Sequence, residues 1–334
     1  MLGLGLAVEL IERYERFLIL SHEEPDGDAL GAALALQAGF IALGKKAVVA
    51  LKDPVPAPFR FLPGVPEIVT DFLVGDYEVL VVVDCGDLAR SGFPARILQF
   101  RASRKPIINI DHHPRNDLTR VASVNIVDTS VAASVELVAD LLNELGVAIV
   151  PSVATQLLTG LYTDTGGFKH SNTTPAVYAL ASSLLAKGAR LKRIVHYVAT
   201  TRTLAALKLW GLVLSRVRQH PSLPLALSMI SQEDLERCRA SLNDLGGVVN
   251  MINSIPGTEA AVLFTELPDG EIKVSIRTER DGIDVSRLAA IFKGGGHKKA
   301  AGFRLRGRIA KRLDGWQIVT EDAKEELIAQ VAER

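Results

Sequence analysis

Three short apolar runs in the first third of the chain each stop at a segment rich in aspartate or histidine. The runs "RFLIL", "EVLVVV" and "KPIIN" lead into "SHEEPDGD", "DCGD" and "IDHH". Apolar, β-branched runs without polar alternation are typical of strands buried on both faces of a parallel sheet. Parallel sheets bind ligands beyond the carboxyl ends of their strands, so the pattern predicts an α/β fold with a site at one sheet edge.

The rest of the first half supplies the expected partners of these strands. A helix is predicted from Ala29 to Leu43, and "KAVVAL" and "ASVNIVD" are further candidate strands. The chain from Ser130 to Arg218 has a nearly continuous helical pattern, which "YTDTGGFKHSNTTP" and Pro151 interrupt.

After "HPSLP" (residues 220–224) the pattern becomes mixed, with strands "LALSMI", "EAAVLFTEL" and "EIKVSIRT" and helices near Asn243–Ile252, at "VSRLAAIF" and in the last segment "EDAKEELIAQVAER". We therefore expect three parts. They are a parallel-sheet domain with helices on both faces over residues 1–190, a helical connector over 191–220, and a smaller mixed α/β domain over 221–334.

Composition limits the class of function. The 334 residues contain 38 Lys+Arg and 38 Asp+Glu, and zero net charge argues against a protein that coats long nucleic acid. Cys85 and Cys238 are far apart and form no metal or redox motif, which favours a reducing compartment. The N-terminus has the pattern of a helix and not of a signal peptide, and no apolar run approaches the ~20 residues of a membrane span. We expect a soluble, cytoplasmic protein.

Acidic and histidine residues concentrate at the predicted strand ends and in "YTDTG". They are His22, Asp26, Asp28, Asp84, Asp111, His112, His113 and Asp164. Histidine combined with several carboxylates suits Mn(II) or a similar ion better than structural zinc. The set is too large for one ion and fits two ions about 3.5–4 Å apart that share a carboxylate, with Asp84 as the natural bridge.

Each motif alone also has an ordinary explanation. Asp28 could be a helix N-cap, Asp84 and Asp164 could be turn residues, and a histidine pair is usually only polar. The four motifs in order make the joint case stronger, because converging carboxylates without a cation repel one another.

These segments resemble a known family. "HEEPDGDALG", "VVVDCGD", "DHH" and "TDTGGF" are similar to the four motifs of the DHH phosphoesterases, the RecJ-like superfamily. "GGGHKKAAGF" is similar to the signature of their DHH-associated C-terminal domain, and the resemblance extends from about Phe17 to Leu305. Within the family, the short length of the chain and its "HSNTTP" segment are most similar to one branch, the bacterial bifunctional oligoribonucleases and pAp phosphatases.

The resemblance implies ligands for two Mn(II) ions, with Mg or Co as possible substitutes. One ion would be held by His22, Asp26 and Asp84, and the other by Asp28, Asp84, His112 and Asp164. Asp111 would orient His112 or its neighbour, and His113 would lie near the phosphate or the leaving oxygen. The implied substrate-binding residues are Lys169, Asn172, Thr173, Arg277, Gly295, Gly296 and His297.

Two features qualify the implied substrate site. "KGGGHKKAAG" alone could be a surface turn, although consecutive glycines can also present N–H groups to an anion. The family often has arginine where this chain has Lys169, serine at Ala32 and glycine at Lys293. A lysine offers a point charge in place of a bidentate fork, so recognition at Lys169 is expected to be looser.

The resemblance implies an Mn-dependent phosphoesterase that hydrolyses short oligoribonucleotides, or pAp to AMP, with a water activated by two metals. Its partners would be short RNA or DNA oligonucleotides or nucleotide 3′,5′-bisphosphates, and it could form a homodimer. Three alternatives stay open. They are a soluble cyclic- or linear-dinucleotide phosphodiesterase, a single-stranded DNA exonuclease, and a non-catalytic nucleotide-binding regulator.

Overall fold

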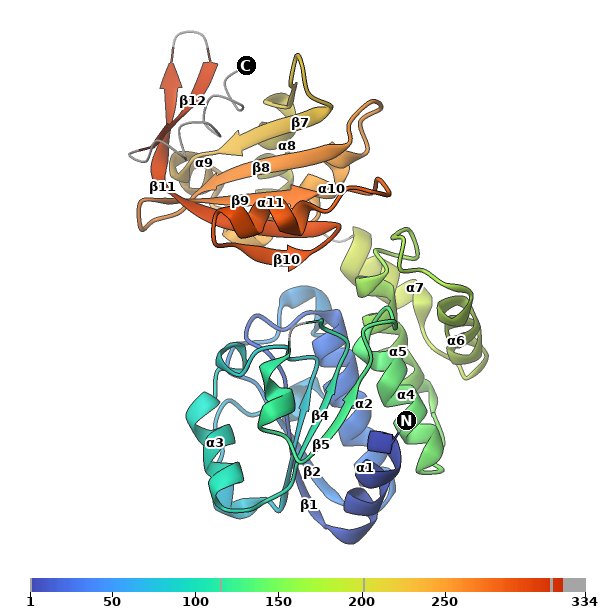
Figure 1. Cartoon of the computed structure of the whole chain (residues 1–334). Coiled ribbons are helices and arrows are strands. Elements are labelled where there is room, and N and C mark those ends of the chain that lie inside the picture. The colour runs from blue at the N-terminus through green and yellow to red at the C-terminus, as the bar shows by residue number, and fades with distance from the viewer. Residues whose placement is uncertain (1, 115, 201, 313–314, 321–334) are drawn as a thin grey trace. The chain divides into compact units, whose positions relative to one another are not determined.

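The computed structural model describes residues 2–114, 116–200, 202–312 and 315–320 (Figure 1). The chain divides into two compact units, residues 1–201 and 202–334. The first unit contains a five-stranded, all-parallel sheet in the order β2-β1-β3-β4-β5. Its strands are β1 (Arg16–Leu20), β2 (Lys46–Ala50), β3 (Val79–Val83), β4 (Ile107–Asp111) and β5 (Val124–Val127). The predicted parallel α/β architecture is confirmed.

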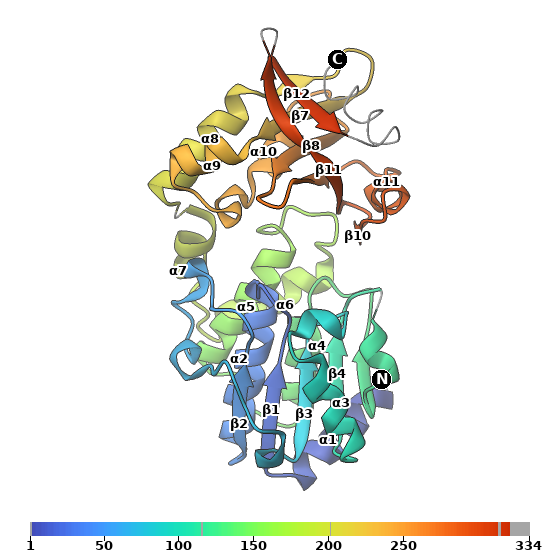
Figure 2. The ribbon, with the colours of Figure 1, turned by 90° about the vertical axis from the view of Figure 1, so that its left-hand side faces the viewer.

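Helices cover both faces of this sheet, as expected (Figure 2). On one face, α1 (Leu2–Arg13), α2 (Gly27–Ala42) and α4 (Ser134–Glu144) contact strands, and α5 (Pro151–Asp164) packs on α2 and α4. The other face packs against α3 (Pro94–Ala102). The remaining helical elements of this unit are α6 (Pro175–Ala186), α7 (Leu191–Ile194), the π-helical η6 (Val195–Thr200) and the 3-10 turns η1 (Ala57–Phe59), η2 (Val65–Glu67), η3 (Val74–Asp76), η4 (Ala89–Ser91) and η5 (Asp117–Arg120).

Glycines set the close packing of α2 against α5. A Cβ on Gly31 would lie 2.5 Å from the Gln156 carbonyl oxygen, and one on Gly27 would lie 2.4 Å from the Thr163 side chain. Side chains at these positions would force the helices apart. The first turn of α2 therefore lies beside the last turn of α5, which ends at Asp164.

The first motif differs in detail from the sequence expectation. The helix begins at Gly27 and not at Ala29, because Asp26 is its N-cap and accepts hydrogen bonds from the N–H groups of Asp28 and Ala29. The role of N-cap suggested for Asp28 therefore belongs to Asp26.

The second unit contains a mixed sheet in the order β10-β11-β9-β8-β7-β6, with β12 paired to β11. Only β7 and β8 pair in parallel among its described strands. The strands are β6 (Arg218–Gln219), β7 (Leu225–Ile230), β8 (Ala260–Glu266), β9 (Glu271–Arg277), β10 (Gly295–His297), β11 (Ala300–Arg312) and β12 (Gly315–Thr320). This unit confirms the expected mixed α/β domain.

The helices of the second unit lie on both sides of this sheet. One side packs against α8 (Leu204–Ser215), α9 (Gln232–Cys238) and α10 (Val248–Asn253), and the other packs against α11 (Val285–Ile291) (Figure 1). The predicted connector, residues 191–220, contains both α7 and α8. In the structure α7 belongs to the first unit and α8 packs within the second. The boundaries at 190 and 220 stay a prediction.

Three details of the second unit depart from the expectation or lie outside it. The helix predicted at Asn243–Ile252 is interrupted, because Gly247 has a φ of +87° between the 3-10 turn η7 (Leu242–Leu245) and α10. The last glycines of the "KGGGH" run form strand β10 and not a turn. The terminal helix expected at residues 321–334 lies outside the described residues. Over the described part of the chain, no helix has the length and apolar character needed to cross a membrane.

Candidate metal centre

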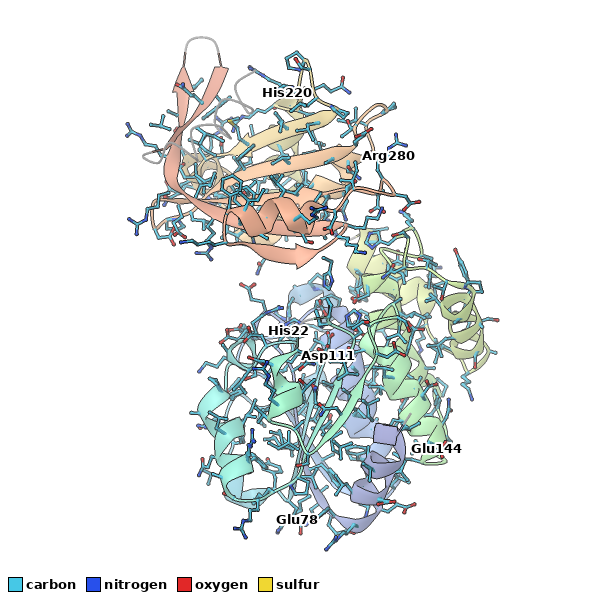
Figure 3. The ribbon with its side chains drawn as sticks, viewed as in Figure 1. His22, Glu78, Asp111, Glu144, His220 and Arg280 are labelled. Carbon is cyan, nitrogen blue, oxygen red and sulfur yellow. The ribbon has the colours of Figure 1, made fainter. Side chains whose placement is uncertain are left out.

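The four motifs of the first unit meet at one edge of its sheet. His22 follows β1, Asp84 follows β3, and Asp111 is the last residue of β4. Figure 3 shows His22 and Asp111 at this carboxyl edge, whereas Glu78, which precedes β3, lies at the opposite edge. The close packing of α5 on α2 adds Asp164 to the group, as the last residue of a helix and not as part of the loop.

Asp84 lies between two histidines. Its side chain is only 2% exposed, and its φ of +55° is a left-handed conformation that few residue types adopt readily. One carboxylate oxygen, Oδ2, lies 3.7 Å from His22 Nε2, and the other, Oδ1, lies 3.6 Å from His112 Nε2. These distances exceed a hydrogen bond, and imidazole nitrogens and carboxylate oxygens are donor types that would hold a divalent cation.

The potential ligands form overlapping groups around Asp84. Within each group the ligand atoms lie within 4.8 Å of one another. The groups are His22, Asp26 and Asp84; Asp28, His112 and Asp164; and Asp84, His112 and His113. His112 Nε2 is also 3.6 Å from Asp164 Oδ2, which connects the second group to Asp84.

The electrostatics of the centre favour a cation. Burial and the neighbouring carboxylates raise the pKa values of Asp28 and Asp164 well above the ordinary aspartate value. Burial opposes the charge of His22 as well, but its contacts with Asp84 and Asp26 outweigh this and raise its pKa to about 9. Nitrogen and carboxylate donors crowded in this way fit a divalent metal, which would neutralise the repulsion between the carboxylates.

Asp28 has a structural task in addition to its place among the ligands. Its oxygens accept hydrogen bonds from the N–H groups of Ser134 (2.5 Å) and Val135 (3.0 Å) at the start of α4. The N-cap of α4 is Ala133, which has no side-chain acceptor, so Asp28 satisfies these N–H groups from a distant part of the chain. The Ser134 hydroxyl in turn donates to Asp84 Oδ1 at 3.0 Å.

Asp111 orients His113 and not His112. Its Oδ1 lies 2.7 Å from His113 Nδ1, and its Oδ2 accepts a hydrogen bond from the Asn116 side chain at 2.6 Å. Burial lowers the pKa of His113, but the hydrogen bond to Asp111 and the charge of Asp84 outweigh it and raise the pKa. Sequence reasoning did not identify Asn116 or Ser134, because neither belongs to a recognisable motif.

The loop after α5 contains the first three residues predicted to bind substrate. Lys169 is exposed, whereas the Asn172 amide donates to the carbonyl oxygens of Asp164 and Ala132 and thereby fixes the loop. His170 Nδ1 lies 3.2 Å from the same Asp164 oxygen. Thr173 Oγ1 is buried and has no hydrogen-bond partner among the described residues, which leaves one polar atom for a ligand.

The other predicted substrate residues lie in the second unit and share one face of its sheet. Arg277 of β9, Ala300 of β11 and His297 of β10 are register partners in one row across three strands. The next row on this face contains Ser275, Gly302 and Gly295. The Arg277 and His297 side chains, at the two ends of the first row, therefore border a floor made of Ala300, Gly302 and Gly295.

The two glycines directly before His297, Gly295 and Gly296, have different requirements. Gly296 has a φ of +134°, and a Cβ there would lie 2.4 Å from the Ala300 carbonyl oxygen, so the backbone requires glycine. A Cβ on Gly295 would meet nothing within 4 Å, so packing does not require glycine there. Burial lowers the pKa of the nearby Arg277 guanidinium.

Replacing Gly160 by alanine is expected to disturb the metal centre through Asp28. The added methyl group would lie 2.7 Å from Asp28 Oδ1 and 2.6 Å from the Val135 side chain. Overpacking of this kind costs about 1–3 kcal/mol, and we expect a lower melting temperature together with weaker Mn(II) binding. Thermal melts with and without Mn(II) measure both effects. Gly5→Ala in α1 is the matched control, since its methyl group would meet nothing within 4 Å. Equal behaviour of the two variants would contradict the prediction.

A parallel α/β unit with histidines and carboxylates at its carboxyl edge, joined to a mixed-sheet unit with a glycine–histidine row, is the architecture of a metal-dependent phosphoesterase. The chain belongs to the DHH family, whose N-terminal domain model matches residues 16–161 and whose DHHA1 domain model matches residues 236–333. It is therefore a hydrolase that acts on phosphoric esters.

Relatives match nearly the whole chain. A bifunctional oligoribonuclease and PAP phosphatase of Thermus thermophilus is 33% identical over 326 residues, which are 96% of this chain and 94% of that protein. A protein of the same description from Mycoplasma genitalium is 28% identical over 298 residues, 89% and 90% of the two chains. The crystal structure of an exopolyphosphatase-related protein from Bacteroides fragilis has a TM-score of 0.86 and 26% identity, and the match covers 99% of this chain and 95% of that one.

Proposed function

We propose that this chain is an Mn(II)-dependent phosphoesterase that hydrolyses short oligoribonucleotides and nucleotide 3′,5′-bisphosphates such as pAp. The observation that carries the proposal is Asp84, whose two oxygens face His22 and His112 within separate groups of potential ligands. The substrate class rests on the two similar proteins described as bifunctional oligoribonucleases and PAP phosphatases.

The ligands are assigned as two sets with one shared member. His22, Asp26 and Asp84 would hold one ion, and Asp28, Asp84, His112 and Asp164 the other. Two divalent cations in this position lower the pKa of a bound water and neutralise charge on a phosphoryl group. Mixed nitrogen and carboxylate donors favour Mn(II) over Mg(II), which prefers oxygen ligands.

In the proposed mechanism, protein side chains orient His113 and Asp84, and His113 supplies a proton to the departing oxygen. The Asp111 carboxylate can only accept a hydrogen bond, so His113 Nδ1 carries the proton between them. Proton transfer to a departing oxygen would then use His113 Nε2, and the raised pKa of His113 favours its protonated form. Ser134 holds Asp84 Oδ1 through its hydroxyl.

Substrate selection is assigned to the second unit and to the loop after α5. The row Arg277–Ala300–His297 combines two cationic or hydrogen-bonding side chains with a flat floor, and Gly295 keeps the adjacent surface low. These residues would grip a terminal phosphate. Within the first unit, Lys169 and Thr173 are proposed to bind substrate, and Asn172 would position their loop.

A substrate panel tests the proposal. The full chain with Mn(II) is offered pAp, a dinucleotide, a five-nucleotide RNA, a long single-stranded DNA and cyclic di-AMP. We expect the largest kcat/KM values for pAp and the two short RNAs, and no turnover in EDTA. Preference for cyclic di-AMP or for the long DNA would select one of the alternative phosphodiesterases. Absence of turnover on every member would contradict the proposal.

A further inference from the structure

Strand β11 has an arginine at every second position between residues 304 and 308. Arg304, Arg306 and Arg308 are exposed, whereas Phe303, Leu305 and Ile309 belong to the core on the opposite face. Alternate residues of a strand point to the same face and lie about 6.8 Å apart. The three guanidinium groups therefore form a regular row on one face of the sheet.

This row continues the surface that contains Arg277 and His297. Ala300 and Gly302 of the same strand form the floor between those two side chains, and the next residues on this face are the arginines. Lys273 of β9 is the register partner of Arg304 and adds a charge beside the row. We name the side chains of Lys273, Arg304, Arg306 and Arg308 the basic track.

Part of the basic track is not neutralised by neighbouring acids. Arg304 Nη1 lies 2.9 Å from Glu271 Oε2 and 3.7 Å from Asp269 Oδ2. Within residues 202–312 and 315–320, no carboxylate lies within 4.0 Å of the side-chain nitrogens of Lys273, Arg306 or Arg308. Because the whole chain has no net charge, the track is a local concentration of positive charge.

Protection of a sheet edge explains the basic track only in part. Charged residues often shield a strand whose backbone groups are unpaired. β11, however, pairs with β9 on one side, and with β10 and β12 over much of the other. Among the described residues, 303–306 of β11 pair with neither β10 nor β12, so Arg304 and Arg306 could shield that edge. Lys273 lies in β9, which pairs with β11 on one side and β8 on the other, so it has no open edge to shield.

We propose that the basic track binds the phosphate backbone of a single-stranded oligonucleotide whose end occupies the Arg277–His297 row. The inference rests on the proposed function and extends it to the length of the substrate. A row of cations at this spacing matches successive phosphates of an extended strand and reads no base. No aromatic residue stands on this face of β9 or of residues 300–310 of β11, so binding should be independent of base sequence.

Salt-dependent binding tests the track in the full chain with Mn(II). The ligands are fluorescent phosphorothioate oligonucleotides of two, five and ten nucleotides, which keep their charge and resist hydrolysis. For the double variant Arg306→Gln/Arg308→Gln we expect about tenfold weaker binding of the longest ligand. The slope of log K against log salt should fall by about 1.4, because each phosphate contact on a single strand contributes about 0.7. Hydrolysis of pAp should stay within about twofold of wild type, since a single nucleotide does not reach Arg306.

The double variant Arg237→Gln/Arg239→Gln is the matched control, because it removes two exposed arginines from the α9 region of the same unit. It should leave the salt slope unchanged. If Arg306→Gln/Arg308→Gln keeps the wild-type slope of log K against log salt, the proposed role of the basic track is wrong. It is also wrong if the variant loses pAp hydrolysis and long-strand binding to the same extent. If wild-type protein hydrolyses none of the panel but the slope still falls, the track stands and the proposed function fails.

Discussion

Replacing Asp84 by asparagine is expected to reduce phosphoester hydrolysis by at least about three orders of magnitude, more than the 10–100-fold cost of losing a ligand's hydrogen-bond partner. Asp84 is the residue that both proposed ligand sets share, so one substitution should weaken both. Asparagine is the appropriate replacement because it keeps the shape of the side chain and tolerates the φ of +55° at this position. Initial rates with saturating Mn(II) measure the loss, and elemental analysis measures the bound metal.

The control for Asp84→Asn is Ser134→Ala. It removes the hydroxyl that donates to Asp84 Oδ1 but leaves every ligand in place, so we expect only a 10–100-fold loss. A second readout is thermal stability, because a ligand that binds only the folded state raises its melting temperature. Mn(II) should stabilise wild type and Ser134→Ala strongly and Asp84→Asn weakly. Full metal content and normal activity in Asp84→Asn would refute the shared-ligand assignment.

Replacing Arg216 by alanine is expected to destabilise the second unit by about 3–5 kcal/mol. Arg216 forms two hydrogen bonds with the buried Asp234 carboxylate, at 2.5 and 2.8 Å, and its guanidinium lies 3.9 Å from the Trp316 ring centre. The variant would leave a buried carboxylate without its cation. Both tryptophans of the chain, Trp210 and Trp316, lie in this unit, so urea unfolding followed by tryptophan fluorescence reports on it directly.

The effect of Arg216→Ala should depend on pH. Burial raises the pKa of Asp234, but the hydrogen bonds from Arg216 and Ser231 outweigh it and lower the pKa. A carboxyl group with a depressed folded pKa stabilises the protein above its unfolded pKa of about 3.9 and loses this contribution as the pH falls through the folded value. The difference between wild type and variant should therefore shrink below about pH 4.

Arg304→Ala is the comparison for this experiment. It breaks the Arg304–Glu271 ion pair, whose side chains are 61% and 32% exposed, and should cost less than about 1 kcal/mol. If the two variants lose the same free energy of unfolding, the buried Arg216–Asp234 pair contributes no more to stability than an exposed ion pair.

The sequence was sufficient to predict which acidic and histidine residues gather at one sheet edge, because these residues coincide with strand ends. His22, Asp84 and Asp111 follow or end buried apolar runs, and a parallel sheet necessarily gathers such positions at one edge. The order of the motifs then identified the family. The sequence could not show which of the two adjacent histidines Asp111 contacts. The backbone and the Asn116–Asp111 hydrogen bond determine that Asp111 contacts His113.

Contacts between distant parts of the chain account for the other omissions. Ser134 begins a helix, as serines commonly do, and nothing in the sequence indicates that it touches Asp84 and Asp28. The pattern also allowed Asp28 to be the N-cap of the helix next to it, whereas Asp26 caps that helix and Asp28 accepts from N–H groups of α4. Strand β10 was missed because glycine has a low strand propensity, and only its pairing with β11 holds it extended.

The capping of α4 by Asp28 has a consequence for the supply of metal to the proposed site. The carboxylate that would bind an ion also completes a helix, and Asp26 does the same for α2, so both turns have internal partners whether or not an ion is present. The protein would therefore keep these two turns ordered before a metal binds. Its activity would follow the metal supply within the time of binding, without new synthesis.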